Sequence, residues 1–231
     1  MKTNSTRLVV LIDRSGSMEA VRDATVAGIN EFIVGQKAEP GEASIRIVQF
    51  DENHGEFSYD VILDKKLNEV TSITREQFQP RGLTPLFDAI GKTINDLGAE
   101  LHALPEVERP ERIMVCIVTD GFNNASQKFS SPQIKDMVQH QEGKYNWKFT
   151  YVGANQDAVL VARTFGISGM NAMSFTADAV HTKSAFRGMS NYVGRVRSAD
   201  IAGLDNIGYE SVERRASVDD GDADKAEVPG A

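Results

Sequence analysis

Short apolar runs, bounded by polar and turn-forming residues, recur along the chain. Most are rich in β-branched residues and nearly continuous, which is typical of strands covered on both faces of a parallel sheet. They predict buried strands at residues 8–12, 45–50, 113–118 and 149–152, and a shorter one at 172–175. Residues 59–63 follow the second run after a turn, which predicts an antiparallel edge hairpin.

Amphipathic helical patterns alternate with these runs. Apolar residues that repeat every three or four positions predict helices with one buried face. Strands that alternate with helices require right-handed crossovers. We therefore expect an α/β fold, with a doubly wound, mostly parallel sheet, one antiparallel edge strand and helices on both faces. The residues that carry the five helical faces are Met18, Val21, Thr25, Ile29, Phe32; Leu86, Ile90, Ile94, Leu97, Leu101; Ile134, Met137, Val138, Gln141; Ala158, Val161, Ala162, Phe165; and Phe186, Met189, Val193, Val196.

The 231 residues divide into one domain, residues 1–210, and an acidic tail, residues 211–231. The tail contains six acidic and three basic residues and few apolar ones. Because so little apolar surface cannot offset the entropy lost on ordering, we expect this tail to be flexible.

Composition excludes several classes of function. A net charge of −8 without a concentrated basic face argues against nucleic-acid binding. The single cysteine, Cys116, excludes an internal disulfide, and four scattered histidines give little support for zinc or histidine-based catalysis. No run approaches the roughly 18 apolar residues of a membrane span. Residues 1–7 lack the apolar core of a signal peptide, so we expect a cytoplasmic protein that does not bind membranes.

The most informative segment follows the first predicted strand. Asp13, Ser15 and Ser17 occupy alternate positions there, and a helix is predicted to begin just beyond them. If the turn curls, their oxygens point toward one place, and Mg²⁺ prefers oxygen ligands at about 2.0–2.1 Å. Ser17 alone is also a good helix cap, so this segment by itself leaves both interpretations open.

Two further segments contribute oxygens at the same edge. Thr84 precedes Pro85 at the start of the second predicted helix, a pair that also suits an ordinary helix start. Asp120 follows the strand at residues 113–118. In a doubly wound sheet this strand and the first one are neighbours at the switch point where ligands bind. Asp13 and Asp120 would therefore face one crevice.

This arrangement resembles the metal-ion-dependent adhesion site (MIDAS) of von Willebrand factor A domains. The resemblance covers the layout of residues 7–197, and its specific part is Asp13-x-Ser15-x-Ser17, with Thr84 and Asp120 further along the chain. The rest of the chain is similar to small stand-alone bacterial and bacteriophage members. The resemblance implies that all five residues bind Mg²⁺ or Mn²⁺, ahead of Ca²⁺, directly or through water.

The same resemblance implies a protein-binding module. One coordination position of the cation would be left for a partner's Asp or Glu carboxylate, as in an adaptor or an assembly component. Intracellular relatives act beside AAA+ ATPases or inside larger assemblies, and a phage-encoded member would be virion-associated. We therefore expect no enzymatic activity.

Two alternatives stay open. One is a metal-dependent hydrolase such as a phosphatase, although these resemble Asp-x-Asp and position 15 here is serine. The other is a structural protein, for instance of a phage virion, in which the ion only stabilises the fold.

Overall fold

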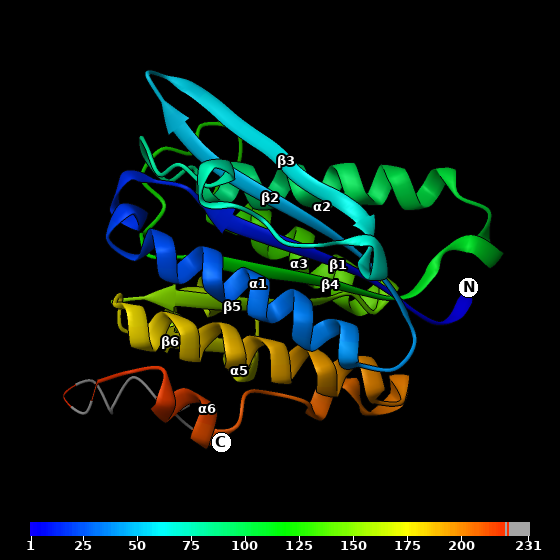
Figure 1. Ribbon diagram of the computed structural model, residues 1–231. Coiled ribbons are helices and arrows are strands. Elements are labelled where there is room, and N and C mark those ends of the chain that lie inside the picture. The colour runs from blue at the N-terminus through cyan, green and yellow to red at the C-terminus, as the bar shows by residue number, and fades with distance from the viewer. Residues whose placement is uncertain (220, 222–231) are drawn as a thin grey trace.

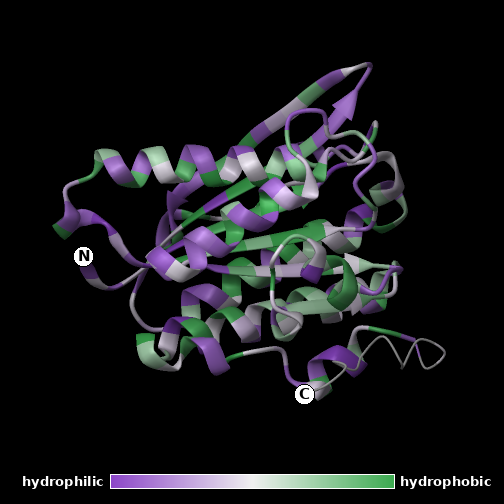
Figure 2. Ribbon diagram, turned by 180° about the vertical axis from the view of Figure 1, so that it is seen from behind, coloured by the Kyte–Doolittle hydropathy of each residue, from purple (hydrophilic) through white to green (hydrophobic). Residues whose placement is uncertain are grey.

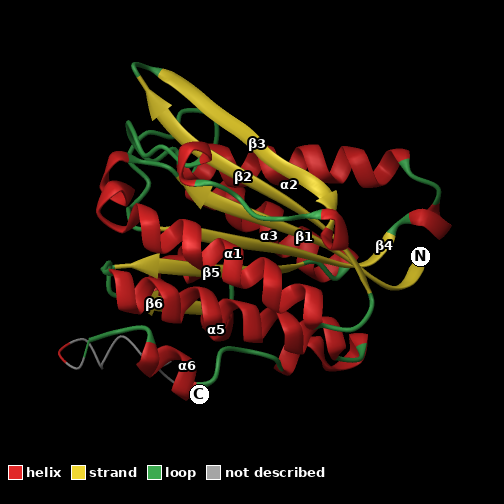
Figure 3. Cartoon of the chain, viewed as in Figure 1, coloured by secondary structure: helices red, strands yellow, loops and turns green. Residues whose placement is uncertain are grey.

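The computed structural model describes residues 1–219 and 221, and its centre is a six-stranded sheet (Figures 1 and 3). The strand order is β3-β2-β1-β4-β5-β6. All neighbouring strands are parallel except β2 and β3, which form an antiparallel hairpin at one edge. The strands are β1 (Lys2–Asp13), β2 (Glu42–Asn53), β3 (Glu56–Lys66), β4 (Pro110–Thr119), β5 (Lys148–Ala154) and β6 (Ala172–Phe175).

Helices cover both faces of the sheet. Alternate residues of β1 serve the two layers: Leu8, Val10 and Ile12 pack on the side of α1 and α5, whereas Val9 and Leu11 pack on the side of α2, α3 and α4. Figure 2 shows hydrophobic residues concentrated in the central strands. The helices are α1 (Arg22–Ala38), α2 (Leu86–Ala103), α3 (Ser131–Tyr145), α4 (Ala158–Thr164), α5 (Ala179–Ser198) and α6 (Ser211–Ala216).

This architecture confirms the predicted fold class, including the antiparallel edge strand. The strands extend beyond the apolar runs because polar residues at their ends still join the backbone ladder, as Ser5 of β1 does opposite Glu42 of β2. A close approach lets α5 pack against α1: a Cβ atom at Gly28 would overlap the ring of Phe186. Within the described residues, no helix is long and apolar enough to cross a membrane.

The chain beyond residue 210 differs from the sequence prediction. Ser211–Ala216 forms α6, and Glu213 and Arg214 are buried against the domain. The Arg214 guanidinium donates to the carbonyl oxygens of Ala172, Gly169 and Met170. These polar contacts hold Ser211–Ala216 against the domain. The sequence predicts a flexible tail because this segment has little apolar surface. Residues 220 and 222–231 of the predicted tail lie outside the described residues.

Candidate metal centre

The carboxyl edge of the sheet brings the five predicted site residues together. Asp13 is the last residue of β1, and Asp120 directly follows β4, the neighbour of β1. Ser15 and Ser17 lie in the turn after β1, and Thr84 lies in the loop before α2. Hydrogen bonds connect the five residues in series, from Thr84 through Asp13, Ser15 and Ser17 to Asp120.

Asp13 is at the centre of this chain of hydrogen bonds and is fully buried. Its Oδ1 accepts the backbone N–H of Ser15 at 2.7 Å. Its Oδ2 accepts the hydroxyls of Thr84 at 3.2 Å and Thr119 at 2.6 Å. The carboxylate is therefore held in one orientation by three donors.

The more exposed half of the site is formed by hydroxyls and a second carboxylate. The hydroxyl oxygens of Ser15 and Ser17 lie 3.1 Å apart, and Ser17 donates to Asp120 Oδ1 at 2.7 Å. Asp120 is half-buried and Ser17 is exposed, so this side faces solvent. A ligand that approaches the site from solvent meets the oxygens of Ser17 and Asp120 before that of the buried Ser15.

The two hydroxyls that suited helix caps do not act as caps. The cap position of α2 is Pro85, not Thr84, and the Thr84 hydroxyl turns to Asp13. The 3-10 turn at Gly16–Val21 likewise has no side-chain cap, and the Ser17 hydroxyl turns to Asp120. Both side chains thus point into the site, which the capping interpretation does not explain.

Backbone contacts fix the Thr84 loop beside the turn after β1. Gly16 N–H donates to the Gly82 carbonyl at 3.1 Å, and Arg81 N–H donates to the Arg14 carbonyl at 2.7 Å. Gly82 has a φ of 67°. A Cβ atom at Gly82 would overlap the carbonyl oxygen of Glu52, so glycine is required for this approach.

Two residues that support the site were missed by sequence analysis. Thr119 donates to Asp13, and Asn124 exchanges two hydrogen bonds with the Thr84 backbone, at 2.8 and 3.1 Å. The position of Thr119 just before Asp120 was a usable signal, because the end of a parallel strand faces the same crevice. Asn124 carries no comparable signal, since its role depends on how the loop after β4 folds back.

Electrostatics at the site favour a cation. Burial raises the pKa of Asp13 to about 6, and the negative charge of Asp120 adds to the rise, although hydrogen bonds from Thr119 and Ser15 oppose it. Burial also raises the pKa of Asp120. Each shift reports the cost of holding negative charge in this crevice, and a divalent cation would remove that cost.

The donor set fits a small, hard cation. Every candidate ligand atom is an oxygen, which is what Mg²⁺ and Mn²⁺ prefer. The oxygens of Ser15, Ser17 and Asp120 lie 3.1 and 2.7 Å apart as hydrogen-bonded pairs, so they face one another across the site.

Comparisons with solved structures agree with the architecture. The pilus adhesin SpaC from Lactobacillus rhamnosus GG, in its open conformation, matches with a TM-score of 0.59 and 11% identity, over 84% of this chain and 30% of its own. Proximal thread matrix protein 1 from the mussel byssus, in a structure with a zinc-occupied MIDAS motif, matches with a TM-score of 0.52 and 12% identity, over 82% of this chain and 46% of its own. This chain spans less than half the length of either protein.

The fold class follows from the sheet. The strand order, the helices on both faces and these neighbours define a doubly wound, mostly parallel α/β fold. At such low identities, the neighbours establish the fold alone. No protein-family model matches the sequence, and a search of the curated proteins returns no match.

Proposed function

We propose that this chain is a divalent-cation-dependent protein-binding module, an adaptor or assembly component, in which a bound cation captures a partner's carboxylate. The observation that carries this proposal is the convergence of oxygens from three segments remote in sequence. Asp13, Ser15 and Ser17 meet Thr84 and Asp120 in one chain of hydrogen bonds at the carboxyl edge of the sheet.

Neutral ligands explain how the cation would hold a partner. The hydroxyls of Ser15, Ser17 and Thr84 would bind the cation, and Asp13 and Asp120 would bind it directly or through water. Because three of these five groups carry no charge, the ion keeps enough positive charge to attract a further carboxylate. Without the ion, Asp13 and Asp120 would repel that same carboxylate, so binding is switched by the metal.

We propose Mg²⁺ or Mn²⁺ ahead of Ca²⁺. The site offers two carboxylates and three hydroxyls. Mg²⁺ is usually bound by one or two carboxylates with water completing its shell, whereas Ca²⁺ takes six to eight oxygen ligands. A zinc-occupied MIDAS motif in a structural neighbour supports a divalent cation but not a choice among them.

Two exposed apolar side chains beside the site support a protein partner. Leu83, next to Thr84, is 47% exposed, and Phe122, two residues after Asp120, is 62% exposed. Aromatic side chains are enriched among the residues that contribute most to binding at protein interfaces. A partner that offers a carboxylate to the ion would cover Leu83 and Phe122 at the same time.

Burial of Asp13 favours binding over phosphoryl-transfer catalysis. A hydrolase of the phosphatase kind would need Asp13 as its nucleophile. Asp13 is fully buried, and both of its oxygens already accept hydrogen bonds. It is therefore positioned to organise ligands and not to attack a substrate, and we infer that the chain is not an enzyme.

Removal of one ligand that the fold does not need tests the proposal. Ser17 is exposed, so Ser17→Ala should keep the fold while it weakens Mn²⁺ binding by about ten- to a hundredfold, as measured by titration calorimetry. Ser198→Ala, at the exposed end of α5, is the matched control and should bind Mn²⁺ like the wild type.

The protein-binding part needs a second measurement. Partners captured from the native host with Mg²⁺ should be released by EDTA and should bind Ser17→Ala more weakly than the wild type. Capture that persists in EDTA would refute the module, whereas a metal that raises only the melting temperature would favour the structural alternative. An AAA+ ATPase or larger assembly as partner, and a cytoplasmic or virion location, stay predictions.

A further inference from the structure

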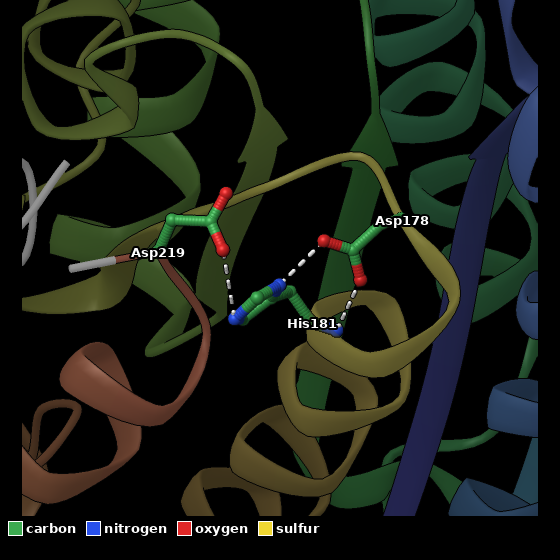
Figure 4. A group of neighbouring side chains, drawn as sticks. All are labelled: Asp178, His181 and Asp219. Carbon is green, nitrogen blue, oxygen red and sulfur yellow. Dashed lines mark hydrogen bonds and ion pairs between the residues drawn. The ribbon is translucent and has the colours of Figure 1, made fainter. Parts of the chain in front are cut away.

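A second group of side chains of the metal-ligand type lies where β6 leads into α5. Asp178 precedes the first turn of α5, His181 lies in that turn, and Asp219 contacts His181 from the segment after α6 (Figure 4). The group offers one imidazole and two carboxylates, with ligand atoms within 4.8 Å of one another. It is a mixed nitrogen and oxygen set, unlike the all-oxygen centre described above.

The distances around the His181 ring distinguish its two nitrogens. Nδ1 lies 2.6 Å from Asp178 Oδ2, a short hydrogen bond. Nε2 lies 3.5 Å from Asp219 Oδ1, which is beyond a good hydrogen bond. A separation of about 3.4 Å is expected between a nitrogen and an oxygen that both bind one tetrahedral Zn²⁺, given bonds of about 2.0–2.2 Å. The Nε2 side of the ring therefore has the spacing of a ligand pair.

Asp178 holds the ring in the orientation that a metal requires. Its Oδ1 accepts the backbone N–H groups of Val180 and His181 at 2.7 and 2.9 Å, so the carboxylate is fixed to the start of α5. Its Oδ2 then accepts the proton on Nδ1, which leaves the lone pair of Nε2 free to bind a cation. A carboxylate behind the far nitrogen is the usual support of zinc-bound histidine.

Asp219 is placed by contacts outside the group. Its backbone N–H donates to Thr176 Oγ1 at 3.0 Å, and the Thr176 N–H donates to the Ser217 carbonyl at 2.9 Å. The Asp219 side chain remains 60% exposed. The carboxylate is thus presented to His181 with room beside it for water or for a ligand from another molecule.

We propose that His181 Nε2 and Asp219 Oδ1 bind a Zn²⁺-class divalent cation, with Asp178 as the positioning residue. Imidazole nitrogen favours Zn²⁺ over Mg²⁺, so this site should take Zn²⁺ and not Mg²⁺. The ion would fasten residues 217–219 to the start of α5, and water would complete its coordination. The proposal does not depend on partner binding at the all-oxygen centre formed by Asp13, Ser15, Ser17, Thr84 and Asp120.

Zinc titration of the full-length, untagged chain tests the proposal. Millimolar Mg²⁺ is present throughout to occupy the all-oxygen centre, and Zn²⁺ binding is measured by calorimetry. The wild type should bind one Zn²⁺ that His181→Ala binds at least about tenfold more weakly. His140→Ala, which removes an exposed histidine of α3, is the matched control and should bind like the wild type.

Further variants guard against a folding defect. Asp219→Asn changes an exposed side chain and should also weaken Zn²⁺ binding, and Asp178→Asn should weaken it by about ten- to a hundredfold without abolishing it. Zinc should slow tryptic cleavage after the exposed Arg215 in the wild type but not in His181→Ala. Equal Zn²⁺ binding by the wild type and a folded His181→Ala or Asp219→Asn variant would overturn the proposal.

Discussion

Glu142 on α3 should make the stability of this protein fall as pH rises toward neutrality. Burial raises the pKa of its carboxyl from 4.5 to about 7, although Lys148 and a hydrogen bond from the Phe149 backbone oppose the rise. One Glu142 oxygen is buried without a hydrogen-bond partner within the described residues. The folded protein thus favours the neutral form of this side chain.

The sign and the size of the effect follow from proton linkage. Between pH 4.5 and about 7 the folded state holds the Glu142 proton more tightly than the unfolded state does. Stability contributed by this group is complete below pH 4.5 and is lost as pH rises through 7. A pKa difference of one corresponds to about 1.4 kcal/mol, so the loss is about 2–3 kcal/mol after allowance for partial solvent contact.

Glu142→Gln isolates this contribution, because glutamine resembles the protonated acid in shape and is never charged. We expect the variant to match the wild type in urea unfolding at pH 4.5 and to exceed it by about 2 kcal/mol at pH 8. Asp136→Asn changes an exposed acid on the same helix and is the control. A stability difference between the variant and the wild type that does not change with pH would refute the reasoning.

Two further substitutions test the supports of the first centre and of the C-terminal segment. Gly82→Ala places a Cβ atom against the Glu52 carbonyl oxygen at a φ of 67°. We expect the free energy of unfolding to fall by about 1–3 kcal/mol in thermal unfolding, and Mn²⁺ binding to weaken. An Mn²⁺ affinity equal to that of the wild type would show that the Thr84 loop does not need this close approach. Arg214→Ala removes the donor to three carbonyl oxygens, so we expect a loss of about 2–3 kcal/mol in stability and faster proteolysis after Arg215. Unchanged proteolysis would contradict the anchoring of α6.

The sequence by itself determined the fold class and most of the first centre. Apolar runs that alternate with amphipathic patterns leave few ways to bury both faces of a sheet, so strand neighbours follow from general rules of connection. These rules predict that Asp13 and Asp120 lie at one edge of the sheet, because the carboxyl ends of neighbouring parallel strands meet there. The resemblance then pointed to Ser15, Ser17 and Thr84, and whether the five bind a cation stays a prediction.

Only the tertiary structure decided which hydroxyls serve the site and where the chain end lies. Thr84 and Ser17 carry the signature of helix caps, and it is loop packing through Gly82 that turns Thr84 to Asp13. The sequence of residues 211–219 predicts a tail, because the contacts that Arg214 makes there are polar and reach carbonyl oxygens remote in sequence. The contact of His181 with Asp219, 38 positions away, follows from that packing. The local sequence pattern does not encode which distant carbonyl oxygens Arg214 will contact.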